Sequence, residues 1–97
     1  MNNKYIAYLS TGEILECSVF KTIFMSARFR VRIDDKPTAA FICNNETKKP
    51  IAIICHMFNK TFIWRADQFH QNIIKMVYEL YMMDEYGRYC WDMMGLE

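Results

Sequence analysis

The longest helical pattern in the sequence covers residues 67–86. Gly87 interrupts the pattern, so residues 88–94 are predicted either as a second short helix or as a continuation bent at the glycine. The apolar positions of the pattern recur every three or four residues, the spacing that turns one face of a helix toward a core. We expect Asp67 to be the N-cap, because its carboxylate can accept hydrogen bonds from the free N–H groups of the first turn. The predicted core-facing residues are Phe69, Ile73, Met76, Val77, Leu80 and Met83.

A second apolar flank lies beside this core stripe, and further aromatic residues follow it toward the C-terminus. Either a sheet wraps widely around the helix and buries the flank, or the flank contacts another chain, since Tyr and Met are enriched at interfaces. A homodimer formed through this helix would also cover it, because symmetric dimers are the commonest oligomers. The residues predicted to bind a partner here are Ile74, Tyr78, Tyr81, Met82, Tyr86, Tyr89 and Trp91.

Near the N-terminus, alternating apolar positions predict a hairpin of strands over residues 4–9 and 14–20. Gly12 can supply the positive φ of a tight turn between them. A two-residue loop would place Leu9 opposite Ile14 and Tyr8 opposite Leu15.

The clearest alternation in the chain covers residues 23–33, which we predict to be a third strand. Its polar face would carry Arg28, Arg30 and Arg32 in a row with a spacing of about 6–7 Å. Such a row can bind phosphates or the carboxylates of a partner protein. It is also typical of a solvated strand face, paired here with Glu13 and Glu16 of the hairpin.

Three further strands are predicted at residues 38–43, 51–58 and 61–65. The middle one is apolar on both alternating faces, which is typical of an inner strand covered on both sides. The turn after it would place Met57 beside Phe62 and Cys55 beside Trp64. We therefore predict an α+β fold: a curved, mainly antiparallel sheet of five or six strands, open or nearly closed into a barrel, with a C-terminal helix on one face. It forms a single domain over residues 1–97, with a sheet region at 1–65 and a helical region at 66–97.

The composition and charge of the chain argue against several classes of binding site and catalytic site. The net charge of the 97-residue chain is +1, so no overall field indicates nucleic acid or an anionic membrane. The four cysteines show no C-x2-C spacing and the chain has only three glycines, so we predict no metal, no cofactor and no catalytic site. No apolar run could span a bilayer and no signal peptide is evident, so a cytoplasmic location is expected.

These observations favour a small non-enzymatic protein-interaction module that occupies the surface of another protein. The chain is rich in Ile, Lys, Asn, Tyr, Phe and Met, as in AT-rich microbial or phage genomes. The hypothesis therefore extends to a phage or mobile-element inhibitor of a host enzyme or defence complex. The alternative is a nucleic-acid-binding module that uses the arginine-striped strand, although Phe29 would point away from that face.

Overall fold

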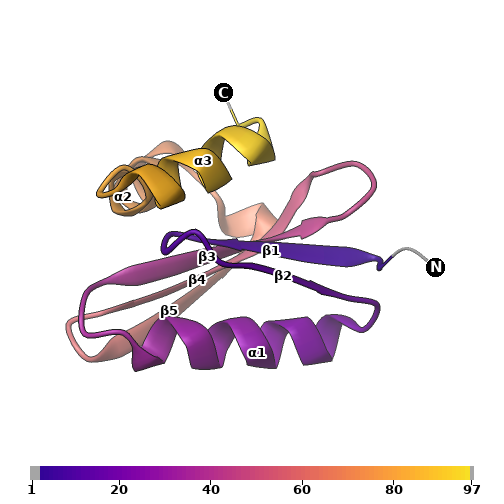
Figure 1. Ribbon diagram of the computed structural model, residues 1–97, viewed down its shortest axis with the longest axis horizontal. Helices are drawn as coiled ribbons and strands as arrows, with labels where there is room; N and C mark the ends of the chain where they lie inside the picture. Colours follow the sequence, from indigo (N-terminus) through magenta and orange to yellow (C-terminus); the bar gives the residue numbers. More distant parts are fainter. Residues whose placement is uncertain (1–2, 97) are drawn as a thin grey trace.

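The fold is a five-stranded antiparallel sheet with helices on both faces, described by a computed structural model over residues 3–96 (Figure 1). The predicted α+β class and the antiparallel sheet are confirmed. The sheet is open, with β2 and β5 at its edges, so the barrel alternative is wrong. The strands, in the spatial order β2-β1-β3-β4-β5, are β1 (Tyr5–Leu9), β2 (Ile14–Cys17), β3 (Thr38–Asn44), β4 (Pro50–Met57) and β5 (Lys60–Arg65).

The first hairpin forms, but its second strand ends at Cys17 instead of residue 20, and its register differs from the prediction by one residue. Tyr8 lies opposite Ile14, not Leu15, because the Leu9 N–H donates to the Glu13 carbonyl over 2.9 Å, which leaves a three-residue turn at residues 10–12 instead of a two-residue turn. Within this turn the Gly12 N–H donates to the Leu9 carbonyl over 3.0 Å, and Gly12 has a φ of 97°. A one-residue slip moves side chains to the other face of a sheet. Leu15 therefore packs on the opposite side of the sheet from Tyr8.

The predicted third strand is in fact a helix, α1 (Phe20–Ile33), so the sheet region at 1–65 also contains helical structure. Residues at the helical spacing, Ile23, Ala27 and Val31, are buried against the sheet. The alternation that predicted a strand arises because a second apolar series with the same four-residue spacing is interleaved with the first. That second series lies on the outside of the helix and consists of Met25, Phe29 and Ile33.

The layer between α1 and the sheet is built from small aliphatic residues. Three alanines of the sheet, Ala7, Ala40 and Ala52, lie in this layer, and small side chains let a helix approach a sheet closely. The other fully buried or nearly buried residues of the layer are Leu9, Ile23, Ala27, Val31, Ile42 and Ile54.

Strands β3 and β4 form the centre of the sheet, and the prediction of an inner strand at 51–58 is confirmed. The β4–β5 hairpin has a two-residue loop at Phe58 and Asn59, whose φ values of 55° and 61° are both positive, as a type I′ turn requires. Cys55 consequently lies opposite Phe62, two residues away from the predicted pairing with Trp64. The shift is even, so each side chain keeps its predicted face.

The C-terminal helical region contains three helices, η1 (Ala66–Gln68), α2 (Gln71–Tyr81) and α3 (Glu85–Met94), where one helix was predicted over residues 67–86. A separate helix at the C-terminus was one of the two predictions for residues 88–94, but it begins before Gly87 and not after it. Asp67 lies within η1, so it is not the N-cap of the long helix; α2 begins after His70, which makes no side-chain cap. Asp84 caps α3, since its carboxylate accepts from the Gly87 N–H over 3.0 Å. That hydrogen bond lowers the pKa of Asp84 below its usual value. Predicted as a core residue, Met83 is exposed in the break between α2 and α3.

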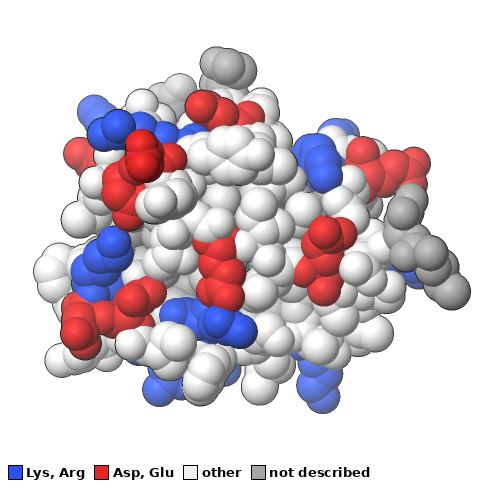
Figure 2. Space-filling model, viewed as in Figure 1, with Lys and Arg blue, Asp and Glu red and all other residues white. Residues whose placement is uncertain are grey.

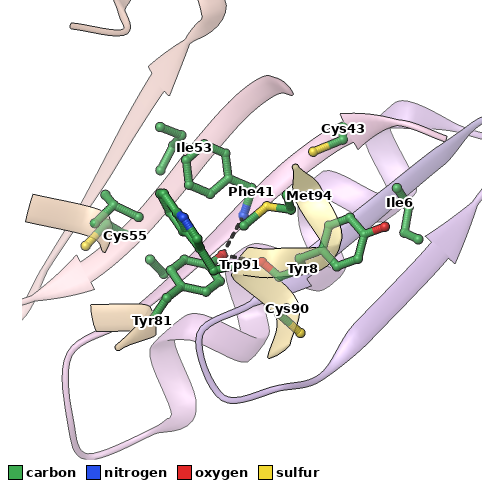
Figure 3. Packing of buried hydrophobic residues seen from close by; sticks show 12 residues of the cluster. Ile6, Tyr8, Phe41, Cys43, Ile53, Cys55, Tyr81, Cys90, Trp91 and Met94 are labelled. Atoms are coloured by element: carbon green, nitrogen blue, oxygen red, sulfur yellow. Dashed lines mark hydrogen bonds between the residues drawn. The ribbon is translucent and has the colours of Figure 1, made fainter. Parts of the chain in front are cut away.

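The layer between the sheet and these two helices is aromatic and sulfur-rich (Figure 3). The Phe41 ring lies edge-on to Trp91, with 5.7 Å between ring centroids, and near Tyr81. The Tyr81 hydroxyl donates to the Tyr8 carbonyl and accepts from the Phe41 N–H over 3.2 Å. This single hydroxyl therefore links α2 to the two neighbouring strands β1 and β3.

Candidate functional site

The outer face of α1 carries an apolar stripe that points away from the sheet. It consists of Met25, Phe29 and Ile33, which are 52%, 63% and 58% exposed. Because they are four residues apart, these side chains lie above one another along the helix surface. We call them the outer stripe.

Basic residues lie along the outer stripe rather than in the predicted row. At about 100° per residue, Arg28 and Arg32 share one side of the helix, whereas Arg30 is rotated about 200° from Arg28. Lys21 lies on the same side as Arg28 and Arg32. Figure 2 shows Lys and Arg side chains along the lower border of the molecule, where Figure 1 places α1. The predicted row of three guanidinium groups is therefore wrong, because it required a strand.

Arg30 makes a contact that the sequence pattern anticipated. Its Nη1 atom lies 2.6 Å from Oε2 of Glu13, at the end of the first hairpin. Both side chains are partly exposed, so this ion pair contributes little to stability. Pairing with Glu13 directs Arg30 to the hairpin and leaves Arg28 and Arg32 as the basic border of the outer stripe.

The C-terminal residues predicted to bind a partner separate into two groups. Tyr81 is fully buried and Trp91 nearly so, which corrects their assignment to a contact surface: they belong to the core. Ile74 and Met82 are half-buried against that core. The remaining predicted residues are exposed, to 41% for Tyr78, 66% for Tyr86 and 62% for Tyr89.

A shallow hollow of about 480 Å³ lies between α2 and α3. The rings of Tyr78 and Trp91 meet edge to face in its wall, with 5.0 Å between centroids. Arg88 closes one side by donating from Nη2 to the Met82 carbonyl over 3.1 Å. The hollow offers aromatic walls with one cation and one carboxylate, Asp92, at its border. This chemistry suits the binding of an apolar or aromatic group.

A second groove, which the sequence pattern did not reveal, runs between α1 and β5. Helix α1 packs on β2, β1, β3 and β4, but the edge strand β5 lies beyond it. The face of β5 on the α1 side of the sheet is therefore left uncovered. A helix over residues 20–33 places Phe20 and Phe24 on one flank of that helix. The sequence pattern could have indicated the groove only if these residues had been predicted as a helix. The groove measures about 630 Å³ and is lined by Phe20, Lys21, Phe24, Ile51, Ala52, Ile63, Arg65, Ala66 and Asp67.

The buried thiols are held in their protonated form. Burial raises the pKa of Cys43 to about 12 and that of Cys55 to about 11, from an ordinary value of 9.0. A thiol at such a pKa is a poor nucleophile and a poor metal ligand, because both roles require the thiolate. His56 Nδ1 lies 2.9 Å from the Thr61 hydroxyl on the neighbouring strand. Within residues 3–96, no group of three or more His, Cys, Asp or Glu side chains could hold a metal ion.

Three surfaces of the described residues therefore combine exposure with apolar character: the outer stripe of α1, the hollow between α2 and α3, and the groove beside β5. None of the helices over residues 3–96 has the length and apolarity needed to cross a membrane. In comparisons with known proteins, no family model, no curated protein and no solved structure matches this chain.

Proposed function

We propose that this protein is a non-enzymatic interaction module that binds an acidic, partly apolar surface of another protein through the outer face of α1. The observation that carries the proposal is the outer stripe. Helix α1 already buries Ile23, Ala27 and Val31 against the sheet, so its fold does not need a second apolar face.

Single exposed apolar residues are common on protein surfaces, but a continuous exposed row is characteristic of interaction sites. Met25, Phe29 and Ile33 form such a row over two turns of one helix. Phe and Met are residues that anchor protein interfaces, and Met adapts its shape to the partner. A partner that covers the row would remove apolar surface from water at the centre of the contact.

The charges beside the stripe indicate what surrounds that centre on the partner. Lys21, Arg28 and Arg32 form no ion pair with any side chain of the described part of the chain. Guanidinium groups bind carboxylates through two parallel hydrogen bonds, so an acidic rim would complement them. Such charges raise the association rate and make it sensitive to salt.

The proposal includes a role for the contact, namely inhibition of a host enzyme or defence complex by a phage or mobile-element protein. It is supported by the composition of the chain, which is rich in Ile, Lys, Asn and Tyr. Nucleic acid is the weaker candidate, because the three arginines do not form the row that successive phosphates would need.

The test places a photo-crosslinking amino acid at Phe29, with a matched control at the exposed Glu79 of α2. A protein captured from a bacterial lysate by the Phe29 derivative alone is then purified and its affinity measured. We expect Phe29→Glu and the pair Arg28→Glu, Arg32→Glu each to weaken binding at least about tenfold, which is about 1.4 kcal/mol. Lys75→Glu on α2 serves as the charge control. Unchanged affinity in both α1 variants would overturn the proposal.

A further inference from the structure

We propose that strand β5 is the site at which two copies of this chain pair edge to edge, in a single register with Phe62 opposite Phe62 of the second copy. The resulting dimer would have one continuous antiparallel sheet. This inference depends on β5 alone, so it holds or fails independently of the function proposed for α1.

The two edges of the sheet differ in how they are protected. Proteins shield free edges with short strands, charges, prolines or bulges. Edge strand β2 has four residues and carries Glu16, whose carboxylate accepts from the Asn45 side chain over 3.2 Å. Edge strand β5 has six residues, KTFIWR, with no proline and with charges only at its ends. Phe62 and Ile63, in its middle, are 37% and 41% exposed, so β5 is the edge open to pairing.

Hydrogen bonding shows which backbone groups of β5 are free. The Arg65 N–H donates to the side-chain oxygen of Gln68 over 2.8 Å and so points away from β4. Backbone groups of alternate residues in a strand point to the same side. The N–H and C=O groups of Thr61 and Ile63 therefore point to the free edge, while Lys60, Phe62 and Trp64 direct theirs to β4.

These groups define the register of a symmetric pair. Antiparallel pairing places hydrogen-bonding residues opposite each other, so Thr61 faces either Ile63 or Thr61 of the second copy. If Thr61 faced Thr61, Ile63 would lie opposite Asn59, whose positive φ of 61° belongs to the hairpin loop and not to a strand. Thr61 is therefore placed opposite Ile63. A two-fold axis then passes between the two Phe62 residues. If Ile63 faced Ile63, Thr61 would face Arg65, whose N–H is already bound. If Phe62 faced Ile63, residues whose backbone groups point to the free edge would face residues whose backbone groups point to β4. Lys60 would also lie opposite Arg65 of the second copy, and the two positive charges would repel each other.

The side chains agree with this register. Phe62 and Trp64 stack in parallel within one copy, with 5.9 Å between centroids and 7° between ring planes. The register brings the two Phe62 rings together, in the type of pair whose side chains approach most closely. It also places Lys60 opposite Trp64 of the second copy, where an ammonium group can lie against an indole ring.

A second copy is the occupant that this edge favours, because the free backbone groups and the Phe62 rings complement themselves about one axis, and the same axis places Lys60 opposite an aromatic ring instead of a like charge. Pairing ends at the bound Arg65 N–H on one side and at the Phe58–Asn59 loop on the other. The contact is therefore one strand long, with four backbone hydrogen bonds. Such an interface lies at the low end of specific interface areas, so we expect a dimer that dissociates on dilution.

Disulfide trapping tests the register directly, in a Cys17→Ser background that removes the half-buried thiol near the surface. Residues facing each other in a non-hydrogen-bonded pair have Cα atoms about 4.5 Å apart, within the range for a disulfide. Phe62→Cys should therefore give a covalent dimer on mild oxidation. Lys60→Cys is the control, since the two copies of this residue lie about 13 Å apart, four positions along the strands. No dimer from Phe62→Cys, or equal dimer from Lys60→Cys, would overturn the register.

Light scattering and sedimentation equilibrium over a wide concentration series test the dimer itself. Ile63→Pro removes an N–H that points to the free edge and leaves the β4 ladder intact, while Ile63→Ala keeps that N–H and removes most of the side chain. We expect the dissociation constant to rise at least about tenfold more in the proline variant than in the alanine variant. Circular dichroism confirms that both remain folded. A wild type that stays monomeric at every concentration, or a dimer lost in Tyr89→Glu but kept in Ile63→Pro, would overturn the proposal.

Discussion

The two faces of the sheet are covered in different ways. On one face a single helix, α1, packs on aliphatic side chains and on alanines that allow a close approach. On the other face two short helices, α2 and α3, enclose Phe41, Tyr81 and Trp91 together with buried cysteines. The α1 layer is held by shape and apolar burial, with one partly exposed ion pair between Arg30 and Glu13 at its border. The α2–α3 layer also depends on a buried hydroxyl and on the close approach of Gly87 to two backbone carbonyls.

The stability of the two layers should therefore respond differently to alkaline pH and to substitutions of buried residues. None of the fully buried residues of the α1 layer among the described residues can ionise. The α2–α3 layer buries the thiols of Cys43, Cys55 and Cys90 and the phenols of Tyr8 and Tyr81. Four experiments test this contrast, beginning with the one that should have the largest effect on stability.

Alkaline pH should destabilise the protein through the α2–α3 layer. Cys43 and Cys55 have folded-state pKa values of about 12 and about 11, against 9.0 for an ordinary thiol, because burial disfavours the thiolate. Above pH 9 the unfolded chain loses these protons while the folded chain keeps them, so stability is full below pH 9 and falls as pH rises toward the folded-state values. Each thiol should lower the free energy of unfolding by up to about 1.4 kcal/mol per pH unit.

Urea denaturation at several pH values from about 8 to 11 measures this dependence. The double variant Cys43→Ala, Cys55→Ala should show a shallower slope, whatever its stability at neutral pH. Equal slopes in the two proteins would show that the thiols do not carry the effect.

Gly87→Ala should cost about 3 kcal/mol of stability. A Cβ atom there would lie 2.5 Å from the Ser10 carbonyl oxygen and still closer to that of Tyr81, and neither backbone atom can move aside cheaply. The control is Gly95→Ala, since nothing lies within 4 Å of a Cβ at Gly95 and only its φ of 68° opposes the change. That variant should lose about 1–2 kcal/mol by thermal or urea unfolding. A smaller loss at Gly87 than at Gly95 would mean that α3 is not held by this contact.

Tyr81→Phe should destabilise the protein, whereas Tyr8→Phe should not. Removing the Tyr81 hydroxyl leaves the Phe41 N–H buried without its acceptor, at a cost of about 1–3 kcal/mol. The hydroxyl of Tyr8 is also buried but has no hydrogen-bond partner within residues 3–96, so its removal should be neutral or stabilising. Chemical denaturation of the two variants measures both effects. Similar losses in both would contradict the role given to the Tyr81 hydroxyl.

Phe29→Ala should have the smallest effect, within about 0.5 kcal/mol of the wild type. Phe29 lies in the outer stripe of α1 and contributes nothing to the α1 layer, although it is as apolar as the residues that do. Ile23→Ala on the inner side of the same helix is the comparison, with an expected loss of about 2–5 kcal/mol. A large loss at Phe29 would show that the stripe is structural and would remove the basis of the proposed function.

The sequence pattern predicted some elements of the fold correctly and others wrongly, for reasons that lie in the spacing of apolar residues. The strands at 38–43, 51–58 and 61–65 were predicted correctly because β-branched and aromatic residues lie between clear turn signals. Residues 20–33 were misassigned because α1 has an inner and an outer apolar series, and two interleaved four-residue spacings imitate the two-residue spacing of a strand. The error placed Arg28, Arg30 and Arg32 on one face of a strand. In the helix, Arg30 lies on a different side from the other two arginines.

Local spacing and turn residues are enough to predict the class of fold, the antiparallel strands at the centre of the sheet and the helical C-terminal region. The same local patterns do not distinguish apolar residues of the core from apolar residues of the surface. Tyr81 and Phe29 are both aromatic residues on helices, yet one is buried beneath α3 and the other points to solvent. Burial depends on which elements pack together, and that is a property of the whole chain rather than of any local pattern.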